Sequence, residues 1–202
     1  MSKLWEILKP DPVAIRNILN ATDLHPIVAT ILVNRSIHNA HDAMRFLSPS
    51  LNQLRSPFSI RDMDKAVQRI FEAICRKEKI LIFGDYDVDG ITASACLYEF
   101  LKLAGARVLC HIPHRSKEGY GLQTLHVSSL LIPQKIQLVI TADCGSGSHE
   151  AVIAAKSNGI DVIVTDHHRI SSPITGAIAV INPNREGCSS GLGHLAGVGV
   201  SF

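Results

Sequence analysis

Membrane-length apolar runs and paired cysteines are both missing from this chain of 202 residues. No segment reaches the roughly 18 uncharged apolar residues that a membrane-spanning helix needs. The N-terminus, MSKLWEILKP, lacks the continuous apolar stretch of a secretory signal. The five cysteines are widely spaced with no C-x-x-C pair, which argues against a disulfide framework and a thiolate zinc site. These absences predict no membrane contact and a reducing, cytoplasmic location.

A strong excess of positive charge is also missing. The formal net charge is +2, and aromatic residues make up only 5% of the chain. A protein that coats nucleic acid non-specifically usually carries a much larger basic surplus, so any nucleic-acid contact is expected to be local. Hydrophobic residues make up 46% of the sequence, which is enough for a buried core and argues against a disordered chain.

The first part of the chain reads as a small helical cap over residues 1–60. Apolar residues recur there at helical spacing and are interrupted by prolines. A second segment begins at Asp62, which we expect to cap a helix with an apolar stripe. We therefore predict two parts, a helical N-terminal cap (1–60) and a larger domain (61–202).

The larger domain alternates short apolar runs with helix-like stretches. The apolar runs lie at 79–84, 107–112, 137–142, 161–166 and 177–182, and the helix-like stretches at 91–104, 121–131 and 147–158. Runs that are apolar along most of their length suit parallel strands covered on both faces. The sequence therefore predicts an α/β fold with a mostly parallel open sheet and helices on both faces. In such sheets, ligands bind outside the carboxyl ends of the strands.

Three carboxylates follow the first apolar run, in Gly84-Asp85-Tyr86-Asp87-Val88-Asp89-Gly90. So many like charges repel one another unless a cation or a set of donors neutralises them. A calcium loop of the EF-hand type matches the opening of this motif, but its twelfth position is Cys96 instead of glutamate, and a strand leads into it. An acidic turn whose aspartate merely caps the next helix is the other alternative.

Polar residues also end two further runs of the same predicted sheet. Asp143 follows the third run, and Asp166, His167 and His168 end or follow the fourth. A single aspartate or histidine at such a place is usually structural, but three such strand ends together favour a metal site. Mixed carboxylate and imidazole ligands suit Mn²⁺ or Mg²⁺, although zinc or iron could also bind. Two such ions would activate water and stabilise charge on a phosphoryl group.

At this point the sequence resembles a known family. GDYDVDG, TADCG and TDHH resemble the first three motifs of the DHH phosphoesterase superfamily. Within it, three further segments are similar to those of the RecJ-type single-strand-specific 5′-to-3′ DNA exonucleases: HIPHRSKEGYGL (111–122), INPNREGC (181–188) and LAGVGVSF (195–202). The resemblance covers essentially the whole chain. It implies hydrolysis of single-stranded DNA in DNA repair and recombination, with two Mn²⁺ or Mg²⁺ ions in the complete enzyme.

The resemblance also implies roles for individual residues. Asp87, Asp89, Asp143 and His167 would ligate the metal ions, with Asp143 as the bridging ligand. His168 would contact the scissile phosphate, while Asp85 and Asp166 would orient the ligands. Arg115 and Lys117 would hold the nucleic-acid backbone, although a solvated charged loop is an alternative for them. Gly197 and Gly199 could bring backbone amides to phosphates, or could belong to a flexible tail.

Two departures from the family pattern bear on these expectations. Many members have a histidine where this chain has Phe83, so one metal ion would have fewer protein ligands. The family's fourth motif, with another aspartate ligand, would lie beyond Phe202, so we expect the chain to be an incomplete catalytic core. Two alternatives follow from this: a phosphodiesterase for short oligonucleotides or cyclic dinucleotides, or a non-catalytic binding protein.

Overall fold

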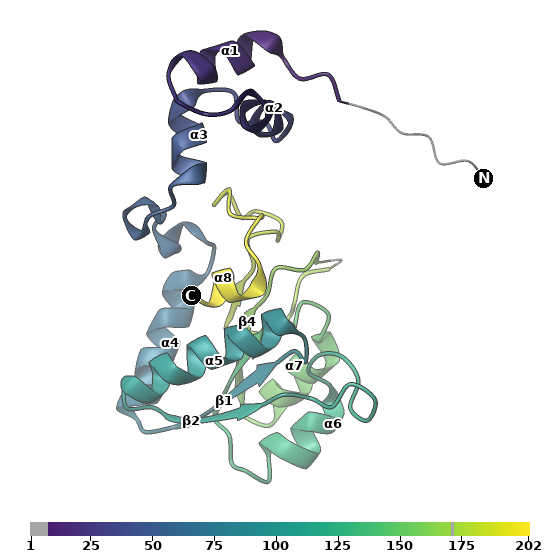
Figure 1. Cartoon of the computed structure of the whole chain (residues 1–202). Helices are drawn as coiled ribbons and strands as arrows, with labels where there is room; N and C mark the ends of the chain where they lie inside the picture. The colour runs from purple at the N-terminus through teal and green to yellow at the C-terminus, as the bar shows by residue number, and fades with distance from the viewer. Residues whose placement is uncertain (1–7, 171) are drawn as a thin grey trace, which may run out of the picture. The chain divides into compact units, whose positions relative to one another are not determined.

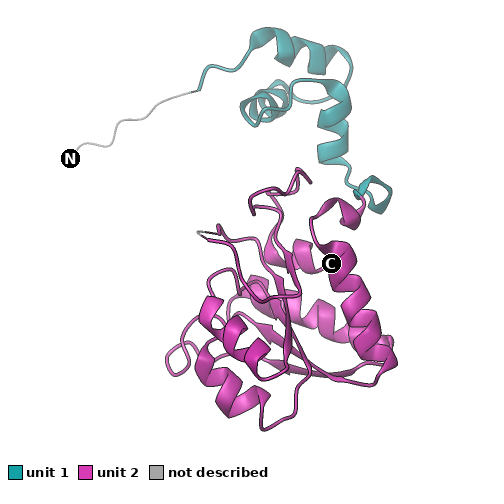
Figure 2. Cartoon of the chain, turned by 180° about the vertical axis from the view of Figure 1, so that it is seen from behind, with its two compact units in different colours: residues 1–55 teal, residues 56–202 magenta. Residues whose placement is uncertain are grey.

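The computed structural model describes residues 8–170 and 172–202. The chain divides into two compact units, residues 1–55 and residues 56–202 (Figure 2). The division lies a little before residue 60, where the sequence pattern changes. Each unit has a hydrophobic core of its own.

The described part of the N-terminal unit contains three short helices around a small core. They are α1 (Pro12–Asn20), α2 (Pro26–Asn34) and α3 (Ala40–Leu47), followed by the 3₁₀ turn η1 (Leu51–Gln53). Asp11 caps α1 by accepting a hydrogen bond from the amide of Val13, and Asn39 caps α3 through the amide of Asp42. The fully buried side chain of Ile18 lies in the core of this unit.

The larger unit is built on a five-stranded sheet in which every pairing is parallel. Its spatial order is β2-β1-β3-β4-β5, and Figure 1 labels β1, β2 and β4. The strands are β1 (Lys79–Gly84), β2 (Arg107–His111), β3 (Leu138–Ala142), β4 (Asp161–Thr165) and β5 (Ala179–Ile181). Each strand lies within an apolar run that the sequence singled out, so the predicted α/β fold with a parallel sheet is confirmed.

Helices cover both faces of the sheet, and the side chains of β1, β3, β4 and β5 alternate between two cores. On one face Leu81 and Phe83 pack with the π-helical turn η3 (Val127–Leu131) and α7 (His149–Ser157), and the ring of Phe83 lies beside that of His126 in α6 (Thr124–His126). On the other face Ile80 and Ile82 pack with residues of α4 (Met63–Cys75), α5 (Val88–Leu103) and α8 (Gly197–Ser201). The short turn η2 (Pro57–Ser59) precedes α4.

One strand does not match the expectation that all strands are covered on both faces. β2 lies at an edge of the sheet, and Leu109 in it is 40% exposed. The apolar run 107–112 therefore predicted the strand but not its burial. An edge strand has a hydrogen-bonded neighbour on one side only, so its side chains need not be enclosed.

Asp62 occupies the expected N-cap position of α4, but its side chain does not cap the helix. Asp62 precedes α4 but has a left-handed backbone (φ 67°), and its side chain makes no capping hydrogen bond. The carboxylate instead pairs with Arg185 and with Lys65. Although burial opposes the shift, these two partners lower the pKa of Asp62. The residue thus links the start of α4 to the segment after β5.

The carboxyl ends of β1, β3 and β4 are aligned in the middle of the sheet. Gly84 pairs with Ala142, and Ala142 pairs with Thr165. The chain leaves β1 toward β2 on one side and later returns to β3 on the other, so the β1–β3 boundary is the point where the strand order reverses. Ligand sites of open parallel sheets form at this point. Among the described residues, no helix is both long and apolar enough to cross a membrane.

Candidate metal centre

Three aspartates continue the hydrogen-bond ladder directly after the aligned strand ends. The amide of Asp85 donates to the carbonyl of Ala142, that of Asp143 to Thr165, and that of Asp166 to Ile181, at 3.0–3.1 Å. All three side chains are buried, with at most 4% exposed. Burying carboxylates costs free energy unless hydrogen-bond donors or cations compensate their charge. This edge of the sheet therefore needs such donors or cations beside the three aspartates.

The turn from β1 into α5 carries the first group of carboxylates. Asp87 caps α5, because its Oδ1 accepts a 2.9 Å hydrogen bond from the amide of Gly90. Asp85 accepts a 2.7 Å hydrogen bond from the amide of Tyr86, and burial is the main reason that its pKa is raised. Asp87 therefore caps the helix and also lies among the carboxylates that could hold a metal ion. A strand leads into this turn, so the helix–loop–helix of an EF-hand is absent from this segment.

Gly90 allows this turn to fold back on Asp85. A Cβ atom at position 90 would lie 2.6 Å from the carbonyl oxygen of Asp85, too close for the backbone to remain in place. We predict that Gly90→Ala lowers the free energy of unfolding by about 1–3 kcal/mol, as overpacking typically does. Urea denaturation would measure the change.

Gly147→Ala is the matched control for that experiment, since a Cβ atom there meets nothing within 4 Å. Its free energy of unfolding is expected to stay close to that of the unchanged chain. Equal stabilities for the two variants would contradict the close approach at Gly90.

Asp143 combines a left-handed backbone with a buried carboxylate oxygen that has no hydrogen-bond partner among the described residues. Its backbone lies in the left-handed region (φ 61°), which costs energy for a residue with a side chain. Its Oδ1 is buried without a hydrogen-bond partner among the described residues and lies 3.2 Å from Nε2 of His167. Burial, and then repulsion from Asp89, raise the pKa of Asp143 to about 7. A cation would offset both the burial and the repulsion.

Asp89 faces the last helix of the chain. Its two oxygens accept hydrogen bonds from the amides of Gly197 (2.6 Å) and Val198 (2.7 Å), and Oδ2 lies 3.6 Å from Nε2 of His167. The amide of Gly197 is thus engaged by Asp89, instead of being free for a phosphate. A Cβ atom at Gly197 would lie 2.3 Å from Oδ1 of Asp143, so this glycine leaves room for the Asp143 carboxylate.

Asp166 holds the two histidines that follow β4. Its Oδ1 accepts from the amides of His167 (2.7 Å) and His168 (3.0 Å) and lies 2.7 Å from Nδ1 of His168. Its Oδ2 accepts from the amide of Ser146. Although burial opposes the shift, these bonds lower the pKa of Asp166. Burial also opposes protonation of His168, but the contact with Asp166 outweighs it and the pKa of His168 is raised.

These contacts gather most of the sequence-predicted site residues. Potential ligand atoms of Asp85, Asp87 and Asp143 lie within 4.8 Å of one another, and so do those of Asp143, His167 and His168. Asp143 belongs to both groups, as a bridging ligand would. We call Asp85, Asp87, Asp89, Asp143, Asp166, His167 and His168 the strand-end cluster. Gly199 lies inside α8, so the flexible-tail alternative does not hold for the described backbone there.

Two tyrosines that the sequence reasoning missed lie between the strand-end cluster and the loop that carries Arg115 and Lys117. The guanidinium of Arg115 lies 5.3 Å from the ring centre of Tyr86, which packs edge-on against Tyr120. The Tyr120 hydroxyl lies 3.4 Å from Nδ1 of His168. The GYG sequence at 119–121 was the available signal, since an aromatic residue between two glycines in a charged loop has no core to fill. Within the described part of the chain, no contact of the Lys117 ammonium group defines its role.

Phe83 occupies the position where the family often has a histidine. It is fully buried, and its ring lies 5.4 Å from that of His111 and 4.8 Å from that of His126. Its side chain therefore belongs to the core beneath α6 and contributes no ligand to the strand-end cluster.

Comparison with a family model matches residues 79–202 to the DHH family, N-terminal domain. The chain is 38% identical over 199 residues to the single-stranded-DNA-specific exonuclease RecJ of Bacillus subtilis, covering 98% of this chain and 25% of that protein. It is 35% identical over 184 residues to the protein of the same name from Haemophilus influenzae, covering 91% of this chain and 31% of that one.

The fold is also similar to solved structures. The structure of RecJ from Thermus thermophilus in complex with Mn²⁺ superposes with a TM-score of 0.75 at 28% identity, covering 98% of this chain and 27% of that one. A structure of exonuclease RecJ bound to manganese superposes with a TM-score of 0.64 at 32% identity, covering 74% and 37%. The chain thus spans about a quarter to a third of the length of the curated relatives.

Proposed function

Because the chain belongs to the DHH family, we propose that it supplies the catalytic core of a metal-dependent exonuclease that hydrolyses single-stranded DNA from the 5′ end. The observation that carries the proposal is the strand-end cluster, in which the buried Asp143 has an oxygen without a hydrogen-bond partner among the described residues and a raised pKa. Two relatives are named as single-stranded-DNA-specific exonucleases. We further propose a role in DNA repair and recombination.

The residues of the cluster fit Mn²⁺ or Mg²⁺ in their chemistry. Carboxylate oxygens suit both ions, and an imidazole favours Mn²⁺. Asp87, Asp89, Asp143 and His167 would hold two ions, with Asp143 shared between them. When bound, the ions would activate a water molecule and neutralise charge on the phosphoryl group. Two of the solved relatives are complexes with manganese and another is a complex with Mg²⁺, which supports a site for either ion.

The other residues would act on the substrate and on the ligands. Asp166 would orient both histidines through the hydrogen bonds described above, and Asp85 would orient the turn that carries Asp87. Since its pKa is raised, His168 holds a proton more readily than a free histidine and can pair with a phosphate oxygen. Arg115 and Lys117 would pair with the phosphates along the strand. Hydrolysis breaks one P–O bond, with water supplying hydroxide to phosphorus and a proton to the leaving oxygen.

A test of this proposal measures nucleotide release from end-labelled DNA with Mn²⁺, with Mg²⁺ and with EDTA. We expect metal-dependent release from 5′ ends of single strands and little from duplexes. Because the chain spans 25% of the Bacillus subtilis relative, the assay should also use a hybrid in which this chain replaces the matching segment of that protein.

Short oligonucleotides and cyclic dinucleotides in the same assay address the alternative substrates. Faster cleavage of these small substrates than of long single strands would contradict the proposed substrate. Absence of metal-dependent cleavage by both the chain and the hybrid would contradict the proposed chemistry and favour a binding protein.

We propose a cytoplasmic location for the protein. All five cysteines are free, as is usual in a reducing compartment. Fractionation of cells that produce the protein, with detection by antibody, would test the location; recovery with the secreted proteins would contradict it.

A further inference from the structure

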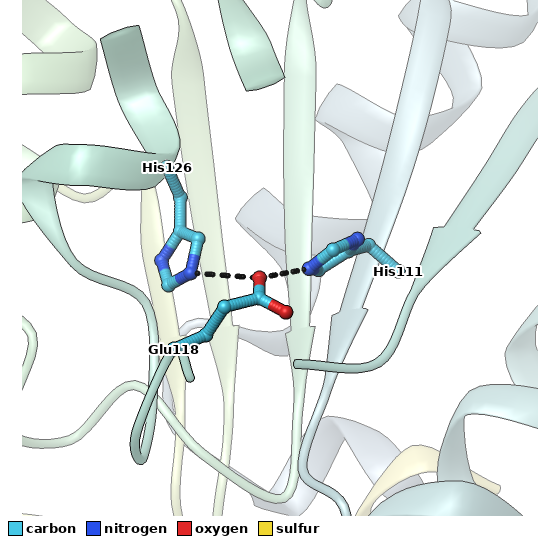
Figure 3. Close-up of side chains that lie close together, drawn as sticks. All are labelled: His111, Glu118 and His126. Carbon is cyan, nitrogen blue, oxygen red and sulfur yellow. Dashed lines mark hydrogen bonds and ion pairs between the residues drawn. The ribbon is translucent and has the colours of Figure 1, made fainter. Parts of the chain in front are cut away.

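A second polar cluster lies outside the strand-end cluster. It consists of His111 at the end of β2, Glu118 in the following loop and His126 at the end of α6 (Figure 3). Oε2 of Glu118 lies 2.8 Å from Nε2 of His111 and 3.3 Å from Nε2 of His126. His126 is only 2% exposed. The proposed hydrolysis uses none of these three side chains, so their arrangement needs its own explanation.

The composition of this cluster is that of a zinc site, with two imidazoles and a carboxylate whose potential ligand atoms lie within 4.8 Å of one another. The hydrogen bonding of His126 argues against metal, however. Its Nδ1 accepts a 3.0 Å hydrogen bond from the amide of Gln123. A neutral imidazole whose Nδ1 is an acceptor carries its proton on Nε2, and a ligating histidine normally donates from its other nitrogen. Nε2 of His126 therefore carries a proton instead of a lone pair for a metal, and it lies 3.3 Å from Oε2 of Glu118 without an aligned hydrogen bond among the described residues.

Glu118 is held from several directions at once. Its Oε1 accepts a 2.8 Å hydrogen bond from the amide of His114, while its Oε2 faces the two imidazoles. The bond from His114 and the contact with His111 lower the pKa of Glu118, so the carboxylate stays charged near neutral pH. The side chain of Gln123 donates to the carbonyl of Glu118 at 3.0 Å. Together, these contacts tie β2, the loop and α6 to one another.

The same loop carries the groups that reach the strand-end cluster. Arg115, three residues before Glu118, lies over Tyr86, and Tyr120, two residues after it, contacts His168. Tyr86 follows Asp85 directly, and its amide donates to that carboxylate. A displacement of Glu118 would therefore also move Arg115 and Tyr120, which contact the strand-end cluster and its neighbour Tyr86.

We infer that Glu118 is a positioning residue, whose carboxylate, held by His111, His126 and the amide of His114, fixes the loop 112–122 so that Arg115 and Lys117 meet the DNA phosphates. The fixing of the loop stands on the contacts alone, whereas its effect on DNA rests on the proposed function. Phe83 supports the arrangement, because its buried ring packs against both histidines.

Hydrogen–deuterium exchange on the chain tests the fixing of the loop. Glu118→Gln removes the charge and turns one acceptor into a donor, so the amides of 112–122 should exchange at least about tenfold faster, as expected for the loss of a charged hydrogen bond. The strands should exchange as before. His111→Gln retains an N–H donor and should keep most of the protection, whereas His111→Leu should lose it. Glu99→Gln, an exposed carboxylate on α5, is the matched control.

Binding of a fluorescent single-stranded oligothymidylate and of Mn²⁺ to the same variants tests the effect on DNA. Glu118→Gln should weaken oligonucleotide binding by about tenfold, the equivalent of one charged hydrogen bond, and leave Mn²⁺ binding unchanged. A merely structural lesion would reduce both. Circular dichroism checks that each variant is folded.

Unchanged exchange in folded Glu118→Gln would overturn the inference. Faster exchange with unchanged oligonucleotide affinity would overturn the link to DNA binding. Failure of both the unaltered chain and the hybrid to bind the oligonucleotide would overturn that link together with the proposed function, while the exchange data would still decide whether Glu118 fixes the loop. Zinc binding to a chain carrying Asp143→Asn and His167→Asn, lost on adding His126→Gln, would identify a metal site in place of the positioning role.

Discussion

Replacing Asp143 with asparagine is expected to lower metal-dependent hydrolysis by about 10³-fold or more, since the variant loses the ligand shared by both groups of the strand-end cluster. Calorimetric titration with Mn²⁺ should show the corresponding loss of binding. The substitution keeps the size of the side chain, so the effect on the metal arises from charge.

The same substitution should stabilise the metal-free chain at alkaline pH. Burial raises the pKa of Asp143 to about 7, so the folded state resists ionisation of this carboxyl group and the unfolded state does not. The resulting cost is fully present above pH 7, shrinks as the pH falls, and vanishes when the carboxyl is protonated in both states, below about pH 4. In EDTA at pH 8, the melting temperature of Asp143→Asn should exceed that of the unaltered chain by at least about 2 °C.

Asp64→Asn, which alters an exposed carboxylate on α4, is the control for both measurements and should change neither. An Asp143→Asn chain that binds Mn²⁺ as tightly as the original would refute the ligand role. A melting temperature of Asp143→Asn below that of the original chain at pH 8 would refute the cost of ionising the buried Asp143 carboxyl group in the folded state. A gain in stability with a loss of activity is the usual exchange at functional sites.

Asp166→Asn is expected to reduce hydrolysis by about 10- to 100-fold, as the loss of a partner that orients ligands typically does. Oδ1 of Asp166 receives the amides of His167 and His168, and Oδ2 receives that of Ser146. Asparagine can accept on only one side, so one of these sets of donors loses its partner. The pKa of His168 should fall, because the anionic partner that raises it is removed.

Nuclear magnetic resonance titration of the His168 ring measures this second effect. In the original chain the raised pKa of His168 contributes stability below its unfolded value, and the contribution is lost as the pH rises through the folded pKa. In Asp166→Asn this contribution should be largely absent. An unchanged titration of His168 in a folded Asp166→Asn chain would show that the Asp166–His168 contact is not the cause of the shift.

The parallel sheet and its order of elements could be predicted because buried strands and their helices leave periodic patterns. The three strand ends with carboxylates could also be predicted, since parallel strands end on the same edge. The exposure of β2 could not, because an apolar run does not reveal whether a strand lies at an edge. The contacts of Asp62 depend on Arg185, which lies far away in the sequence, and so local spacing could not indicate them.

The details of the site depended likewise on contacts between distant segments. Asp89 accepts hydrogen bonds from the amides of Gly197 and Val198, more than a hundred residues later in the chain. Gly197, which was expected to bind phosphate, thus donates its amide to a carboxylate. The cluster of His111, Glu118 and His126 carries no recognisable motif spacing, since its members come from a strand, a loop and a helix. The roles of individual metal-binding and phosphate-binding residues stay predictions until they are measured.

Diffraction from crystals of the chain grown with MnCl₂, recorded at the manganese absorption edge, tests the metal centre most directly. We expect anomalous density at the carboxyl ends of β1, β3 and β4, in contact with Asp143 and His167, and none between His111 and His126. Crystals in which manganese binds elsewhere on the chain, while the strand-end cluster holds no metal, would contradict the assignment of this cluster as the catalytic metal centre.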